Sequence, residues 1–173
     1  METKVKVHVF ESAGLGKAPF RFFGIEERRG PIEISPGRFV GSPGQPMGVC
    51  DFCGESIVEC CHIVSSDGKH FVVGNVCVGK TGDEGLKLVV EKAVRERRTE
   101  ALHRKQDAVI ESVKTALADS NTRQALSSQP HPYEWLAKRG LTRLDWSEWM
   151  MKNAGRKGRC DVGKWLQANN FMS

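Results

Sequence analysis

The apolar and polar positions near the start of the chain predict two β-strands and a loop. Residues 4–11 (KVKVHVFE) alternate valine with lysine or histidine, which is the period of a strand with one buried face. Residues 19–26 (PFRFFGIE) predict a second strand. The glycine- and proline-rich stretch 35–48 (SPGRFVGSPGQPMG) then predicts a loop.

Residues 56–75 predict a β-hairpin. Two apolar runs, SIVECCHIV and KHFVV, flank the turn sequence SSDG, and Asp-Gly between apolar runs is a strong hairpin signal. With the turn centred on Asp67 and Gly68, the register places Val58 opposite Cys77. Cys60 then shares the face of Val58, and Cys61 points to the other face.

A helical pattern follows over residues 83–118, and Thr81 with Glu84 has the spacing of a capping box. Its apolar residues form two stripes that are out of phase across a charged centre. The stripes consist of Leu86, Val90 and Ala93, and of Leu102, Val109, Val113 and Ala116. We therefore expect a kinked helix, or two helices that pack on different surfaces.

Residues 132–173 contain all four tryptophans and predict a separate helical unit after a linker over 119–131. The pattern predicts three short helices, over 133–139 and closed by Gly140, over 143–153 with Thr142 as N-cap, and over 161–169. The predicted fold class is α+β, with a β-rich region at 1–85, a long helix and this three-helix unit.

Length and composition favour one domain, or one domain with a small appendage, because 173 residues can bury a substantial core. No apolar run approaches the length of a membrane span, and the first residues contain no signal-like apolar stretch. We therefore expect a soluble, cytoplasmic protein with no membrane partner. In a reducing compartment, a C-x-x-C motif indicates metal or redox chemistry in preference to disulfides.

Three cysteines have the pattern of a zinc site. CDFCG places Cys50 and Cys53 in a C-x-x-C-G knuckle, where backbone amides face the sulfurs, and Cys77 stands where the hairpin ends and a helix begins. We take Cys60 as the preferred fourth ligand because it shares the predicted face. Cys61, His62, His70 and His8 remain alternatives. A site made mostly of thiolates predicts a structural Zn²⁺ ion.

The octapeptide GNVCVGKT (residues 74–81) also fits the P-loop pattern G-x-x-x-x-G-K-[ST]. A P-loop belongs to a buried parallel sheet, whereas the strand before Gly74 is the second arm of an antiparallel hairpin. Only helices are predicted after Thr81. We therefore interpret the match as coincidence and expect no enzyme here, with nucleotide binding as the alternative.

Charge is unevenly distributed. Residues 50–85 contain two Lys and Arg against six Asp and Glu, whereas residues 119–173 contain nine against five. A polyanion would therefore meet the C-terminal half, and we expect DNA or RNA phosphates to be contacted there. The predicted contact residues are Arg143, Lys152, Arg156, Lys157, Arg159 and Lys164, together with Arg95, Arg97 and Arg98.

Protein binding is the second function class. Two helices around a short glycine turn at YEWLAKRGLTRLDWSEWM have the outline of a helix-turn-helix, and such units also serve as docking modules. In this reading the tryptophans or the acidic cysteine region would contact a host protein, with a purely structural zinc site.

The order of knuckle, hairpin and helix over residues 48–95 resembles treble-clef and zinc-ribbon fingers. The chain differs from the treble clef because Lys80, three residues after Cys77, stands where a second C-x-x-C would end. HVFESAGLGKAPFRFFG, VGNVCVGKTGD and LTRLDWSEWMMKNAG are similar to segments of small uncharacterised bacteriophage and prophage proteins. That resemblance implies a phage-borne protein in a bacterial host and implies no activity.

Overall fold

The computed structural model describes residues 7–172, which form an α+β fold, as the sequence predicts. One compact unit extends to Arg98, and a second begins at Thr99. We call them the N-terminal unit and the C-terminal unit. Helix α3 (Glu84–Ala118) continues from the first into the second.

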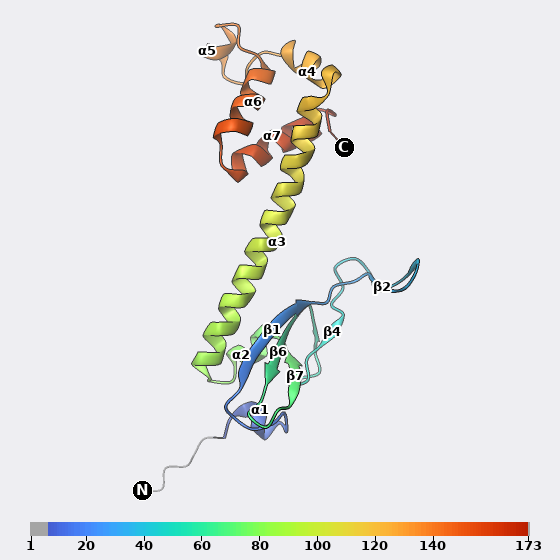
Figure 1. Ribbon diagram of the computed structural model, residues 1–173, viewed down its shortest axis with the longest axis vertical. Helices are drawn as coiled ribbons and strands as arrows, with labels where there is room; N and C mark the ends of the chain where they lie inside the picture. The colour runs from blue at the N-terminus through green and yellow to red at the C-terminus, as the bar shows by residue number, and fades with distance from the viewer. Residues whose placement is uncertain (1–6, 173) are drawn as a thin grey trace. The chain divides into compact units, whose positions relative to one another are not determined.

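The main sheet of the N-terminal unit contains three antiparallel strands. They are β1 (Arg21–Glu27), β6 (Glu59–Val64) and β7 (His70–Val73), in the order β1-β6-β7 (Figure 1). The β6–β7 hairpin turns at residues 65–68, where Gly68 has a φ of 83°. The predicted second strand and the predicted hairpin are therefore confirmed.

Two smaller pairs of strands lie in the region predicted as a loop or next to it. β2 (Ile32–Ser35) pairs with β3 (Arg38–Val40), and β4 (Gly48–Val49) pairs with β5 (Ser56–Ile57). Every residue of β2 and β3 is exposed, so no buried face gives this hairpin a hydrophobic period. Its strands could not be distinguished from a loop by pattern.

The predicted first strand is wrong over its described residues, because Val7 and His8 lie in no strand and Val9–Ser12 form a helix, α1. Residues 4–6 of that prediction lie outside the described residues. His8 caps α1 by accepting a hydrogen bond from the Phe10 amide at Nδ1, at 3.2 Å. The helix turns Phe10 into the core, where its ring packs edge-on against Phe20 and Phe71. This tertiary packing overrides the local valine alternation.

The hairpin register differs by one residue from the predicted one. Cys61 pairs with Val73, which would place Val58 opposite Val76 if the strands continued. β7 ends at Val73 instead, and α2 (Asn75–Gly79) contains Cys77. The one-residue change exchanges the faces of β6, so Cys61 faces the core of the N-terminal unit and Cys60 faces away from it.

Helix α3 is continuous, so the prediction of two helices is wrong, although its two stripes do pack in different cores. Leu86 and Val90 are buried in the N-terminal unit, and Val113 is buried in the C-terminal unit. Leu102 is exposed, although the sequence pattern placed it in the second apolar stripe and so predicted it to be packed. The helix is capped by Asp83, whose carboxylate accepts from the Leu86 amide at 2.9 Å, and not by Thr81.

The C-terminal unit contains four helices besides the end of α3. They are α4 (Ser120–Ser127), α5 (Glu134–Ala137), α6 (Arg143–Asn153) and α7 (Arg156–Ala168) (Figure 1). The bounds and the Thr142 cap of α6 are as predicted. Helix α4 lies within the predicted linker, and α7 begins five residues before its predicted start. The core contains Val113, Leu117, Leu126, Val162 and Leu166.

Among residues 7–172, no helix combines the length and the apolar character that crossing a membrane requires.

Candidate metal centre

The knuckle that contains Cys50 and Cys53 is a closed turn between β4 and β5. The amide of Gly54 donates to the carbonyl of Cys50 at 2.8 Å, and Gly54 has a φ of 76°. The knuckle is also attached to β7, because the Asp51 carboxylate accepts from the Val72 amide at 2.6 Å and the Asp51 amide donates back to the Val72 carbonyl. These bonds hold the knuckle against the hairpin.

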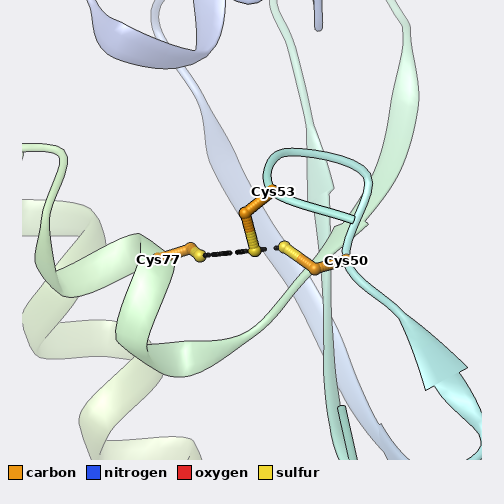
Figure 2. Close-up of side chains that lie close together, drawn as sticks. All are labelled: Cys50, Cys53 and Cys77. Atoms are coloured by element: carbon orange, nitrogen blue, oxygen red, sulfur yellow. Dashed lines mark hydrogen bonds between the residues drawn. The ribbon is translucent and has the colours of Figure 1, made fainter. Parts of the chain in front are cut away.

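Cys77 approaches the knuckle from α2. Gly74 is the N-cap of this one-turn helix and is the single residue between the end of β7 and the start of α2. Cys77 and Val78 are the buried residues of α2, and both belong to the core of the N-terminal unit. The turn from strand to helix therefore points the Cys77 thiol at the knuckle, as Figure 2 shows.

The three sulfurs are close enough to bind one metal ion. Cys77 Sγ lies 3.8 Å from Cys50 Sγ and 3.4 Å from Cys53 Sγ, and all three atoms lie within 4.8 Å of one another (Figure 2). In a tetrahedral site with Zn–S bonds of about 2.3 Å, two sulfurs stand about 3.8 Å apart. The spacing and the soft donor set both fit a thiolate-binding ion such as Zn²⁺.

The surroundings favour a thiolate at Cys50. Burial alone would raise the pKa of Cys50, but the amides of Gly74, Cys53 and Phe52 hydrogen-bond its sulfur, and the pKa lies below its usual value. Burial and hydrogen bonds to the other two thiols raise the pKa of Cys77 to about 12. A cation between the three sulfurs would replace these shared protons and favour the thiolate form of all three.

The structure does not bring Cys60, the preferred fourth ligand, to this group. Cys60 lies on the opposite face of β6 and packs against Gly48. A Cβ atom added to Gly48 would come to 2.3 Å from the Cys60 sulfur. Cys61 faces the core that contains Cys50, and burial raises the pKa of its thiol to about 12. It also remains outside the group. The one-residue register difference explains why the predicted face was wrong.

The histidine alternatives point elsewhere too. His8 Nε2 lies 3.8 Å from the Asp83 carboxylate, and His62 lies 3.3 Å from the Glu26 carboxylate. The His70 ring packs edge-on against Phe23. Within residues 7–172 the group therefore consists of three cysteines.

The P-loop match does not form a phosphate cradle. Its central residues are the helix α2, and Lys80 is the C-cap of that helix. In a P-loop the glycine-rich loop precedes the helix and its lysine stands at the helix N-terminus. The Thr81 hydroxyl is buried and donates to the Val78 carbonyl at 2.8 Å, where a magnesium ligand would face the nucleotide.

The arginines predicted on α3 mostly contact their own unit. Arg98 makes two hydrogen bonds with the Glu59 carboxylate, both of 2.8 Å. Arg97 donates to the Ile25 carbonyl at 2.7 Å. Arg95 is exposed. These contacts attach α3 to the sheet, so Arg97 and Arg98 are already engaged within the fold.

The basic residues predicted on α7 are also largely engaged. Arg156 pairs with Asp107, and Lys164 lies 3.0 Å from the Asp161 carboxylate. The Arg159 guanidinium donates to the C-cap carbonyl of α6 at 2.9 Å. The pairing of Arg156 with Asp107 adds a negative charge from outside residues 119–173, whereas the bond from Arg159 to a carbonyl leaves its charge in place.

Arg143 lies over two indole rings, at 4.3 Å from the centroid of Trp165 and 5.3 Å from that of Trp146. Its Nε is buried without a hydrogen bond. Of the predicted set, Lys152 and Lys157 are exposed and make no hydrogen bond or ion pair with the described residues. Lys152 and Lys157 are thus the members of the set without an internal contact, and nucleic-acid binding by the set stays a prediction.

No known protein family matches this sequence. No curated protein matches it. No solved structure matches the fold. The resemblances to finger proteins and to phage proteins, and the cytoplasmic location, therefore stay predictions.

Two contributors to the site were missed from the sequence. Asp51 attaches the knuckle to β7, and the Gly74 amide hydrogen-bonds the Cys50 sulfur. An aspartate inside C-x-x-C, and a glycine three residues before the third cysteine, are the signals that could have indicated them. Both roles depend on long-range pairing that local patterns do not show.

Proposed function

We propose that this protein is a zinc-stabilised binding protein and not an enzyme, in which Cys50, Cys53 and Cys77 hold Zn²⁺ and the C-terminal unit contacts a partner. The metal site is supported by the close approach of three sulfur atoms from two segments that are 24 residues apart in the sequence. Thiolates are the ligands that structural zinc prefers.

A structural role follows from what the three residues connect. The knuckle is attached to β7 through Asp51, and Cys77 belongs to the helix that follows β7. An ion held by all three sulfurs would fix the knuckle against the start of α2 and so close the edge of the sheet. Because such a site does not form in the unfolded chain, the binding free energy would contribute to folding.

Metal analysis of purified protein tests this proposal. We expect about one zinc per chain, and we expect Cys53→Ser and Cys77→Ser each to lose it. Cys160→Ser is the matched control, because Cys160 is buried in the C-terminal unit and lies outside the sulfur group. Wild-type protein that contains no zinc, or Cys77→Ser protein that retains it, would reject the site.

For the partner, the structure favours a protein over a nucleic acid. Trp135 and Trp149 are 59% and 61% exposed, and tryptophan is the residue most enriched among binding hot spots. Most of the predicted phosphate-binding cations are engaged by carboxylates, carbonyls or rings of the chain itself. We therefore place protein binding first and nucleic-acid binding second.

Nucleic-acid binding remains the second candidate because Lys152 and Lys157 are exposed and unpaired near the start of α7. Two phosphate contacts predict a log-log salt slope near −1.8 on duplex DNA, roughly a tenfold loss of affinity between 50 and 200 mM salt. The double variant Lys152→Glu/Lys157→Glu should abolish such binding, and Lys114→Glu should not. Absence of binding to DNA and RNA at 50 mM salt would remove this candidate.

A further inference from the structure

An apolar groove lies within the C-terminal unit, between the segment around α5 and one side of α6. Its volume is about 440 Å³, which is within the range of ligand sites. Its walls include Trp135 and Leu141 on one side and Trp146, Trp149 and Met150 on the other. The last three are spaced i, i+3 and i+4, so they form one stripe of α6.

The floor of the groove is fixed and its rim is exposed. Trp146 and Met150 pack against the core of the C-terminal unit, and Arg143 lies over the Trp146 ring. Tyr133, Trp135 and Trp149, on the rim, are between 58% and 61% exposed. A rigid apolar floor surrounded by large aromatic side chains is the arrangement of a binding hot spot, because little side-chain order is lost on binding.

The acidic residues next to the groove are already engaged. Glu134 lies 2.8 Å from the Lys138 ammonium, and Glu148 lies 2.7 Å from the Arg123 guanidinium. The Asp145 carboxylate accepts from the amide and from the hydroxyl of Thr142, both at 2.7 Å. Glu134 and Glu148 are therefore each offset by a cation, whereas Asp145 is held by neutral hydrogen-bond donors and keeps its negative charge.

Besides Arg143 over the Trp146 ring, two exposed cations beside the groove have no carboxylate partner among the described residues. The Arg139 guanidinium lies over the rim residue Trp135, 5.3 Å from the ring centroid. Lys152 follows Trp149 by three residues on α6 and is exposed. Even with the negative charge of Asp145 included, the surroundings of the groove carry a net positive charge, which an acidic ligand would neutralise.

We propose that this groove binds an amphipathic helical segment of another protein, which places apolar anchors between Trp135 and Trp149 and acidic residues beside Arg139 and Lys152. A helix in a groove presents anchors at i, i+3 or i+4 and i+7. The mostly apolar and aromatic lining favours a peptide with apolar anchors over a phosphate backbone at this position. The inference rests on the proposed protein-binding function and names its partner class.

A displayed library of random peptides of about 15 residues tests the proposal, because this length suffices for a helix with three anchors. We expect enriched peptides to combine two or three large apolar residues at helical spacing with a net negative charge. A chosen peptide should lose at least tenfold in affinity when its acidic residues are changed to lysine. Absence of enrichment, or equal binding of both peptides, would overturn the proposal.

Variants locate the binding surface. Trp149→Ala and Trp135→Ala should each weaken peptide binding at least tenfold, and Arg139→Glu with Lys152→Glu should reverse the charge preference. Phe23→Ala is the matched control, because Phe23 is 75% exposed in the N-terminal unit. Unchanged binding by both tryptophan variants, with unchanged melting temperatures, would place the peptide elsewhere.

The same measurements distinguish the other occupants. Competition by a single-stranded oligonucleotide would assign the groove to nucleic acid, and self-association abolished by Trp149→Ala would assign it to a second copy of the chain; either result overturns the proposal. Zinc content is measured in the same samples. Protein that contains zinc but binds no peptide would reject the groove proposal and support the metal site. Protein that binds peptide but contains no zinc would support the groove proposal and reject the metal site.

Discussion

The two units of the chain are stabilised by different means. In the N-terminal unit β2 and β3 are fully exposed, and β4 and β5 have two residues each. Isolated pairs of such strands are marginal in water, so the proposed metal link between the knuckle and α2 would have a large effect there. The C-terminal unit instead has four helices and the end of α3 around a leucine- and valine-rich core, with several large side chains packed against it.

The difference shows where each kind of stabilisation is needed. The N-terminal unit has a buried core that includes Phe10, Phe20 and Phe71, but β2 to β5 are short or exposed. An ion held by three thiolates would therefore add stability at the knuckle between β4 and β5. Amphipathic helices bury their apolar stripes directly and need no metal. The four tryptophans and the one tyrosine all lie in the C-terminal unit. Intrinsic fluorescence therefore reports on one unit alone.

The largest expected effect separates the two units. Chelation of the metal, or Cys77→Ser, should unfold the N-terminal unit because the metal contributes its binding free energy to folding. We expect its amide NMR signals to lose dispersion, while the tryptophan emission maximum and the denaturation midpoint of the C-terminal unit change little. If chelation shifted tryptophan emission to that of the unfolded protein, the units would not be stabilised independently.

A core substitution should produce the reverse pattern. Leu166 is fully buried beside Val113 and Leu126, so Leu166→Ala should lower the free energy of unfolding of the C-terminal unit by about 2–5 kcal/mol. Tryptophan-detected urea denaturation measures the loss. Zinc content should remain that of the wild type, and loss of zinc in this variant would contradict the separation.

A smaller effect is expected at the capping box of α6. Hydrogen bonds from Thr142 lower the pKa of Asp145, so the folded pKa lies below the unfolded one. The stabilisation is therefore present above about pH 4 and is lost as the pH falls through the folded pKa. Asp145→Asn should cost a few tenths to about 1 kcal/mol at pH 7.

The same substitution should cost less at a pH below the folded pKa of Asp145, because the carboxyl group is then neutral, as the amide is. Tryptophan-detected urea denaturation at the two pH values measures the difference. A cost that does not change with pH would show that the carboxylate charge contributes nothing to the cap.

Local signals in the sequence were sufficient for several elements. Asp67-Gly68 predicted the hairpin, Thr142 and Asp145 predicted the start of α6, and C-x-x-C predicted the knuckle. Each depends on residues a few positions apart, whose backbone preferences or hydrogen bonds are formed locally. The long helix ended at Ala118 as predicted because its apolar period stops there.

Features that depend on tertiary contacts could not be predicted in the same way. The one-residue register of the hairpin decided which of Cys60 and Cys61 faces the core, and the sequence contains no signal for it. The positive charge of α7 was overestimated because Asp107, the partner of Arg156, lies 49 residues earlier on α3. Exposed Trp135 and Trp149 likewise could not be distinguished from the partly buried Trp146 and Trp165 by spacing alone.

Zinc X-ray absorption spectroscopy tests the central claim, that Cys50, Cys53 and Cys77 are the cysteines that hold the metal. All six cysteines lie in the described part of the chain, and the other three lie outside the sulfur group. The expected spectrum has three sulfur neighbours at about 2.3 Å and one lighter ligand. Four sulfur neighbours, or a zinc ion with only nitrogen and oxygen ligands, would contradict the account.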